Sequence, residues 1–434
     1  MVLFAVLIVA QGALRKWIFP GLSTPLYIAK DVALFGGLIA FLWRRDFRLA
    51  IPLRQTLLPI LWGGLACIVV LQAFNLYVPS ALVGILGIRS YLLYSVLLVL
   101  MPVALQYVER PQRLVSIVAI GVVAPILCLG MRQYTMPQGH WINQYAAEGA
   151  QVETVMGRTR ITGTFSYIQA MRPFLIFSFA FGVGTLIAGI RRERRWYQII
   201  GLVLLGLSLV VAPMNGSRGV VFGICLALPF VLYAAFQQGR RTALVLGIVL
   251  LVLVGGYIGT QTDLAVRAWE TFQTRVESAA DRGGNVSRIE SMLWDPIDKV
   301  SIGGILGYGA GATHPGASLL APLEALPDVG GEEELGRVII ELGVFGAAFF
   351  SSLKAWILWV VWQAMMRART AWEDIICMTA FPVALQHLYV DKIVFNHVGG
   401  AIYWLCVGAA VWVWSRRSTP KARHSSRKPA RSSL

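Results

Sequence analysis

Apolar stretches of about 20 residues recur along most of the chain, separated by short polar connections. A stretch of that length crosses the roughly 30 Å hydrocarbon layer of a bilayer as a helix. The pattern therefore predicts an all-α polytopic membrane protein with about twelve transmembrane helices. The predicted spans are residues 2–19, 26–43, 56–75, 89–107, 114–132, 171–190, 196–213, 219–237, 243–260, 338–364, 374–391 and 398–415.

Clusters of basic residues occur after every second predicted span, which gives the chain an orientation. Cytoplasmic loops carry an excess of Lys and Arg, so these clusters predict a bacterial inner-membrane protein with both termini in the cytoplasm. The clusters are Arg44/Arg45/Arg48/Arg54, Arg110/Arg113, Arg191/Arg192/Arg194/Arg195, Arg240/Arg241, Arg367/Arg369 and the tail from Arg416 to Arg431.

The composition excludes a soluble protein. Hydrophobic residues make up 57% of the chain and charged residues only 14%, which is more apolar surface than a water-soluble fold could cover. The net charge of +16 could suggest nucleic-acid binding in a soluble protein. Here the basic loops and contact with membrane lipids explain it, so no nucleic-acid partner is expected.

The predicted organisation is a single transmembrane domain over residues 1–415. It contains a large periplasmic loop, residues 261–337, between the ninth and tenth spans, and a second long outer connection at about 133–170. Loops of that size usually carry function. Residues 416–434 are rich in Ser, Lys and Arg and predict a disordered basic cytoplasmic tail.

Cations are unexpectedly frequent on the outer side, where the positive-inside rule disfavours them. A charge at mid-membrane depth costs about 2.5–3.5 kcal/mol, so such residues are usually functional or paired. Convergent arginines suit a diphosphate, because each guanidinium binds two phosphate oxygens at once. Local pairing of Lys30 or Arg15 with Asp31 is the simpler alternative. The outer cations are Arg15, Lys16, Lys30, Arg89, Arg132, Arg158, Arg160, Arg172, Arg218, Arg337 and Lys392.

Two short motifs place arginines beside predicted turns. Arg160 opens the stretch Arg-Ile-Thr-Gly-Thr-Phe, which precedes the sixth span. Arg218 lies in the Asn-Gly-Ser-Arg-Gly turn between the seventh and eighth spans. Backbone N–H groups at such a helix N-terminus favour an anion. An ordinary helix–helix turn with an interfacial arginine is the alternative.

The end of the large loop combines glycines, a histidine and carboxylates. A glycine-rich run over 303–311 leads to His314, and Glu334, Arg337 and Glu341 follow at a spacing that puts them on one helix face. A carboxylate beside an arginine could orient a phosphate and accept a proton. An intrahelical salt-bridge ladder explains the spacing equally well.

Taken in order, these pieces resemble the superfamily of O-antigen ligases and polysaccharide polymerases, bacterial envelope glycosyltransferases. The resemblance covers most of the chain. It rests on the number of spans, the large loop between spans nine and ten, the motifs at Arg160 and Arg218, Arg288 ahead of the glycine run and His314, and Gly-Val-Phe-Gly from Gly343. Each motif is short, and their order carries the match.

The resemblance implies a GT-C-like helical fold and transfer of a glycan from undecaprenyl diphosphate at the periplasmic face. It implies neither a nucleotide-sugar donor nor a metal or other cofactor, and in the ligases a periplasmic His and several Arg are implicated. One departure stands out, because the family's His usually lies close before the Gly-x-x-Gly, whereas His314 precedes Gly343 by 29 positions. This departure makes Glu334, Arg337 and Glu341 stronger candidates for the site.

The leading hypothesis assigns each candidate a role in such a transfer. The base would be His314 or Glu341, and Arg337 would act in both binding and catalysis. The acceptor would be lipid A core, for a ligase, or a second lipid-linked glycan, for a polymerase. The residues expected to bind the diphosphate of the polyprenyl-linked donor are Arg89, Arg160, Arg218, Arg288 and Arg337.

Two alternatives come from other functional classes. A transporter or flippase of lipid-linked oligosaccharide would also need outer cations, but it should carry charges and broken helices near the bilayer midplane. The sequence places the ionisable groups at the outer rim, which favours a one-sided enzyme. A non-catalytic envelope assembly protein is the third possibility.

Overall fold

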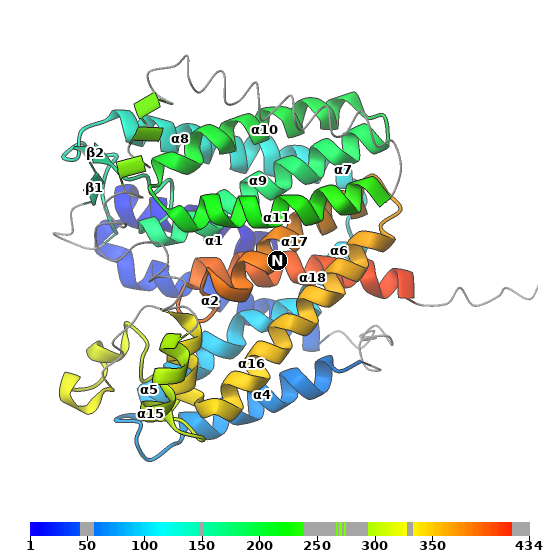
Figure 1. Ribbon diagram of the computed structural model, residues 1–434. Coiled ribbons are helices and arrows are strands. Elements are labelled where there is room, and N and C mark those ends of the chain that lie inside the picture. Colours follow the sequence, from blue (N-terminus) through cyan, green and yellow to red (C-terminus); the bar gives the residue numbers. More distant parts are fainter. Residues whose placement is uncertain are drawn as a thin grey trace, which may run out of the picture.

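The computed structural model describes residues 1–43, 56–146, 152–155, 157–237, 266–267, 269–270, 273–274, 294–327 and 333–418. These residues form an all-α structure (Figure 1). Its α-helices are α1 (Val2–Ala13), α2 (Ser23–Leu42), α4 (Leu58–Ala73), α5 (Ala81–Ile88), α6 (Leu97–Gln106), α7 (Pro111–Ser116), α8 (Ala124–Thr135), α9 (Ile168–Arg191), α10 (Arg195–Met214), α11 (Arg218–Gln237), α15 (Val300–Gly303), α16 (Glu334–Arg367), α17 (Ala371–Tyr389) and α18 (His397–Ser418).

Short irregular helices interrupt or join these elements. Three are π-helical turns, η1 (Leu14–Ile18), η3 (Arg89–Leu93) and η5 (Ile117–Val123). Four are 3₁₀ turns, η2 (Pro20–Leu22), η4 (Tyr94–Val96), η6 (Ala317–Leu319) and η7 (Leu323–Ala325). One small hairpin pairs β1 (Thr154–Val155) antiparallel with β2 (Arg158–Thr159), within the predicted outer connection 133–170.

The described residues contain seven helices that are long and apolar enough to cross a membrane, so the chain is a multi-pass membrane protein. Helices occupy every predicted span except 243–260, which lies outside the described residues. Two of them, Leu58–Ala73 and Arg218–Phe230, are shorter apolar helices. The total of twelve spans and the GT-C-like arrangement stay predictions.

Helices α9 and α18 form the centre of the bundle. In α9 the most apolar stretch is 89% buried and in α18 it is 83% buried, against 22% for the span of α2. Helices α10, α11 and α17 pack against α9, and α6, α16 and α17 pack against α18. Figure 1 shows α9, α10 and α11 side by side in the upper part of the bundle, with α16 beside α4 in the lower part.

The helix α16 reverses direction at Gly343. Glu334 and Lys354 are 20 positions apart, which would separate them by about 30 Å in a straight helix. They instead form an ion pair of 3.0 Å, with both side chains buried. Gly343 has a φ of 70°, so α16 is two helical segments that fold back on each other at this residue.

The glycine-rich run from Gly303 to Gly311 satisfies the backbone groups that this break leaves unpaired. Tyr308 N–H donates to the carbonyl of Ile340 (2.7 Å), and Val344 N–H donates to that of Gly304 (3.2 Å). The contact is between two backbones: a Cβ at Gly307 would lie 2.5 Å from the Glu341 carbonyl oxygen, and one at Gly343 would lie 2.2 Å from that of Ile305. Only glycine fits at both positions.

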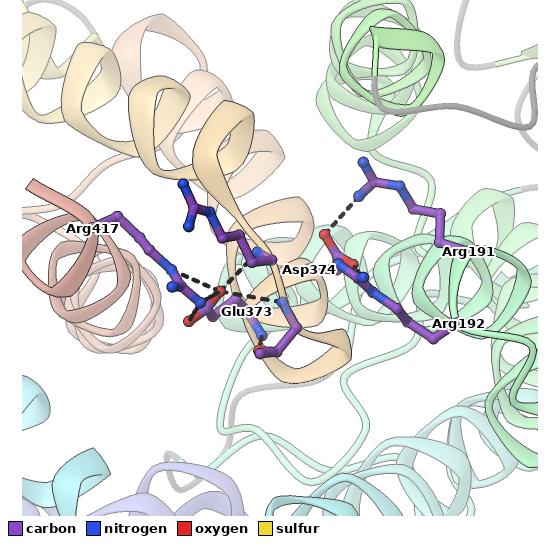
Figure 2. Close-up of polar contacts among 7 residues, drawn as sticks. Arg191, Arg192, Glu373, Asp374 and Arg417 are labelled. Atoms are coloured by element: carbon purple, nitrogen blue, oxygen red, sulfur yellow. Dashed lines mark hydrogen bonds and ion pairs between the residues drawn. The ribbon is translucent and has the colours of Figure 1, made fainter.

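Ion pairs join three helices at the predicted cytoplasmic end (Figure 2). Asp374 is fully buried and binds Arg191 at 2.6 Å and Arg192 at 3.3 Å, which ties α17 to the end of α9. Glu373 binds Arg417 of α18 at 2.7 Å. Glu373 also completes a capping box with Thr370 that starts α17. Basic residues of two predicted cytoplasmic segments, the cluster after α9 and the C-terminal tail, therefore meet on one pair of carboxylates.

Gly343→Ala should destabilise the protein, because alanine disfavours a φ of 70° and its Cβ would overlap the Ile305 carbonyl oxygen. We expect a loss of about 3 kcal/mol in the free energy of unfolding, measured as a lower thermal midpoint in detergent. Gly206→Ala in α10 is the control, since its Cβ would meet nothing within 4 Å. Equal midpoints for the two variants would contradict the assigned break.

Candidate functional site

An ion pair between the half-buried Arg89 and the buried Asp31 joins α2 to the π-helical turn η3. The Arg89 guanidinium donates to Asp31 Oδ2 from Nε (2.9 Å) and from Nη2 (2.6 Å). The Tyr94 hydroxyl donates to the other oxygen, Oδ1, at 2.6 Å. Asp31 therefore pairs with an arginine on another helix, and not with its neighbours Lys30 or Arg15 as the local-pairing alternative expected.

Three cations surround the ring of Tyr27, and we call this group the Tyr27 cluster. Lys30 Nζ lies 4.2 Å from the ring centroid, Arg89 Cζ 5.1 Å and Arg15 Cζ 5.3 Å. Arg15 also donates to the hydroxyls of Ser23 and Ser166, at 2.8 and 3.1 Å. Asp31 is the one carboxylate that the described residues place in ion-pair contact with this cluster. Positive charge therefore exceeds negative charge here, which favours an anionic ligand.

Both arginines of the cluster lie on π-helical turns. Arg15 belongs to η1 and Arg89 is the first residue of η3. Such turns often occur at functional sites, because the extra residue changes the direction in which the following side chains point. The third turn, η5, consists of apolar residues and carries no comparable group.

Two histidines contact each other and Arg89 on one side of the cluster. His314, in the connection before α16, lies with its Nε2 3.2 Å from Nε2 of His397, the first residue of α18. Arg89 Nη1 lies 3.1 Å from the same His397 nitrogen. The rings of Tyr27 and Tyr94 pack against His397 at centroid distances of 5.7 and 6.1 Å.

Burial and the nearby guanidinium groups keep His314 neutral. Burial, followed by the positive charges of Arg89 and Arg337, lowers the pKa of His314 to about 4. At neutral pH the imidazole can therefore accept a proton, provided that one of its nitrogens is free to do so. An anion bound beside Arg89 would oppose their charge and raise this pKa.

Arg337 and Glu341 hold the residue next to His314. One Glu341 oxygen accepts from the Thr313 backbone N–H (2.8 Å) and hydroxyl (2.7 Å). Arg337 Nη1 donates to the Thr313 carbonyl oxygen at 3.2 Å, and its guanidinium lies 5.4 Å from the centre of the Phe395 ring. Glu341 is fully buried, so in this structure its carboxylate positions the loop that carries His314.

The third carboxylate of the predicted helix face, Glu334, points elsewhere. Its Oε2 pairs with Lys354, and its Oε1 accepts from the N–H groups of Ile393 and Val394 at 2.5 and 2.8 Å. Glu334 therefore has these partners in place of the expected salt-bridge ladder with Arg337 and Glu341. They also place a buried ion pair between the two segments of α16.

Arg160 and Arg218 lie at a different part of the predicted outer end. Arg160 Nε donates to the Asn215 carbonyl oxygen at 2.9 Å, and its guanidinium pairs with Glu153. Arg218 is the first residue of α11, in the same turn as Asn215. The structure therefore brings Arg89, Arg337, Glu341 and His314 together, and it places Arg160 with the turn of Arg218. Arg288 lies outside the described residues.

The stretch after Arg160 forms a turn held by two buried side chains. Gln133 Oε1 accepts from the N–H groups of Thr162 and Gly163 at 3.0 and 2.7 Å. Lys16 Nζ donates to the Thr162 hydroxyl (3.0 Å) and the Gly163 carbonyl oxygen (2.8 Å). Gly163 has a φ of 56°. The motif thus connects the N-terminal helix to α8, which explains its composition without a bound anion.

Sequence reasoning missed His397 and Tyr27, and it gave no site role to Asp31. His397 had one available signal, since it is an ionisable residue at the outer end of the last predicted span. Nothing in the sequence indicated that it meets His314, which is 83 positions away. Comparison with known proteins assigns no family, because no family model and no curated protein matches the chain.

The depressed pKa of His314 predicts a loss of stability in acid. Its unfolded value is about 6.5 and its folded value is about 4. Between these values the unfolded chain binds more protons, so the free energy of unfolding falls as the pH falls. From pH 7 to pH 5 we expect His314 to account for a loss on the order of 1 kcal/mol.

Thermal unfolding of wild type, His314→Gln and the control His140→Gln at both pH values measures this. The acid-induced drop in midpoint should be smaller for His314→Gln than for the other two proteins. A drop of the same size in all three would mean that His314 protonates equally in the folded and unfolded chain.

Proposed function

We propose that this protein is a glycosyltransferase of the O-antigen ligase or polysaccharide polymerase type. It would act at the periplasmic face of the bacterial inner membrane, with both termini in the cytoplasm. The observation that carries the proposal is the Tyr27 cluster beside the neutral His314. Excess positive charge suits a polyprenyl-diphosphate donor, and a neutral imidazole next to it suits deprotonation of an acceptor hydroxyl.

In this proposal the Tyr27 cluster binds the donor diphosphate. Arg89 presents a guanidinium that already contacts His397, and Arg15 and Lys30 add charge from neighbouring segments. Arg337, whose charge also acts on His314, completes the set from α16. As the bond between the glycan and the diphosphate breaks, these cations stabilise the charge on the leaving group.

The transfer itself needs a base and no further energy source. A hydroxyl oxygen of the acceptor, lipid A core or a second lipid-linked glycan, forms a bond to the anomeric carbon. The bond from that carbon to the diphosphate oxygen breaks, and the hydroxyl proton passes to His314. We favour His314 over Glu341 as the base because the Glu341 carboxylate is buried and already accepts two hydrogen bonds from Thr313.

The second group of arginines suits the acceptor side. A polymerase binds two lipid-linked diphosphates, one on the donor and one on the acceptor. Arg160 and Arg218, at the turn between α10 and α11, are candidates for the second, together with Arg288. A ligase with a lipid A core acceptor would depend on them less.

Transport of lipid-linked oligosaccharide is the second candidate, and one observation favours it. Helix α16 is broken at Gly343, and the Glu334–Lys354 ion pair is buried between its segments. Broken helices with interior charges are typical of transporters. The two functions differ in outcome, because a flippase moves the donor lipid across a bilayer and leaves the diphosphate bond intact.

The proposed topology places residues 261–337 outside the cytoplasm. In a variant lacking the native cysteines, Ser318→Cys should react with a membrane-impermeant thiol reagent in intact spheroplasts. Arg194→Cys, in the connection between α9 and α10, should react only after lysis. Both residues are exposed, so access within the protein is matched. The reverse labelling pattern would overturn both the topology and the proposed site of reaction.

Purified protein should transfer glycan from a polyprenyl-diphosphate donor to an acceptor in the presence of EDTA and without ATP. Arg89→Ala and His314→Ala should each lower the rate at least about 100-fold. The rate of Arg89→Lys should lie between those of wild type and Arg89→Ala, because lysine keeps the charge but lacks the planar guanidinium that binds two oxygens. Arg132→Ala, which removes an exposed outer cation on α8, is the control and should retain activity.

The same assay separates the two candidate bases and tests the metal-free mechanism. Glu341→Gln keeps an oxygen that can accept from Thr313, so activity should persist if His314 is the base. Loss of activity in Glu341→Gln with retention in His314→Ala would reverse the assignment. Inhibition by EDTA that Mg²⁺ or Mn²⁺ relieves would reject the arginine-only mechanism and turn attention to the acids at 332–334.

A further inference from the structure

The hydrogen bonds around His314 and His397 determine which ring nitrogen of each histidine carries the proton. Gly316 N–H donates to Nδ1 of His314 at 2.9 Å, so that nitrogen carries the lone pair. The proton of the neutral His314 ring must then be on Nε2. Because this Nε2 lies 3.2 Å from Nε2 of His397, it donates to that nitrogen, which must be unprotonated.

The hydrogen bonds of His397 likewise determine which of its nitrogens carries the proton. Its Nε2 accepts from His314 and, at 3.1 Å, from Nη1 of Arg89. The proton of its neutral ring is therefore on Nδ1, which is buried and has no hydrogen-bond partner in the described part of the chain. Packing of the ring against Tyr27 and Tyr94 holds this orientation.

This arrangement limits how His314 could act as a base. Its one lone pair, on Nδ1, faces the Gly316 N–H, and its other nitrogen already carries a proton. A proton that enters at Nδ1 makes His314 a cation between Arg89 and Arg337, unless the Nε2 proton leaves at the same time. Among the described residues, the nitrogen in line to receive that proton is Nε2 of His397.

We propose that His314 and His397 act together as one base, an inference that rests on the proposed transferase function. The acceptor hydroxyl replaces the Gly316 N–H at His314 Nδ1 and gives it a proton. The Nε2 proton of His314 passes to His397 Nε2, and Arg89 gives up its contact there. His314 ends neutral with its proton moved from Nε2 to Nδ1, and His397 ends as the imidazolium. His397 acts through His314 and is therefore a positioning residue that also holds the proton.

The surroundings make this proton transfer depend on the donor. Arg89, Arg337 and Lys30 oppose a positive charge on the pair, whereas Asp31 and Glu341, which holds the adjacent Thr313, favour it. Tyr27 and Tyr94 are the tyrosines that pack against His397. Without a ligand these three cations outnumber the two carboxylates, so the pair stays neutral. A diphosphate bound at the Tyr27 cluster would reverse the local charge and draw Arg89 Nη1 away from His397. The pair would then accept a proton only when the donor is in place.

Nitrogen-15 NMR of protein labelled at its five histidines tests the pair without a glycan. The free protein should show His314 protonated on Nε2 and His397 on Nδ1. Inorganic diphosphate, used as the probe, should raise the pKa of the pair by at least about one unit. In His397→Gln, His314 should still titrate but without a second, coupled step. His140→Gln serves as the control and should leave both signals unchanged.

Kinetics of the same variants complete the test. His397→Gln should lower kcat about 10- to 100-fold, leave the KM for the donor nearly unchanged and shift the acid limb of the pH profile. A His397→Gln enzyme with wild-type kcat and pH profile, or other proton positions in the free protein, would overturn the paired base. If wild type transfers no glycan yet the pair shows the expected protons and response to diphosphate, the transferase assignment fails while the anion-linked proton site stands.

Discussion

The break of α16 at Gly343 is the constraint on which the rest of the predicted outer end depends. A helix that reverses inside a membrane protein leaves backbone N–H and C=O groups that water cannot reach. The run from Gly303 to Gly311 forms hydrogen bonds with those groups. The two segments can approach closely enough only because each has glycine at the contact. The same hydrogen bonds that pair the backbone groups of the broken helix also hold the glycine-rich run in place. His314 follows directly after this run, so its position is set by the same interaction.

Charge is arranged differently at the two ends of the bundle. At the predicted cytoplasmic end, Glu373 and Asp374 neutralise basic residues at the ends of α9 and α18, and these ion pairs join both helices to α17. At the other end Arg89 has one carboxylate partner, while Arg15 and Lys30 are held by hydroxyls, a carbonyl and a tyrosine ring. Among the residues that the structure describes, the charges of Arg15 and Lys30 are therefore not compensated by a directly bound carboxylate, whereas the carboxylates at the predicted cytoplasmic end join helices through their ion pairs.

The sequence predicted the helices well because each span is a property of its own residues. It also singled out His314, Arg89 and Arg337, which the structure places near one another, while the roles assigned to them stay predictions. It did not predict the partners, because Asp31 with Arg89 and His314 with His397 are contacts across many positions that depend on how helices pack. Glu334 illustrates the limit best. Its spacing pointed to Arg337 and Glu341, but the reversal at Gly343 brings Lys354 to it instead.

The π-helical turns under Arg15 and Arg89 have a consequence for how this surface can change. Each such turn fits one more residue into the helix than an α-helical path would hold. The residues before and after the turn are therefore offset by about 100° around the axis. At η3, this offset lies between α5, which contacts the glycine-rich run, and α6, which packs against α18. The side-chain directions of α5 are therefore not in register with those of α6. Insertion or loss of a single residue at this point would rotate one segment relative to the other. The helix would thus present a new set of side chains at that end while its packing in the bundle stays intact.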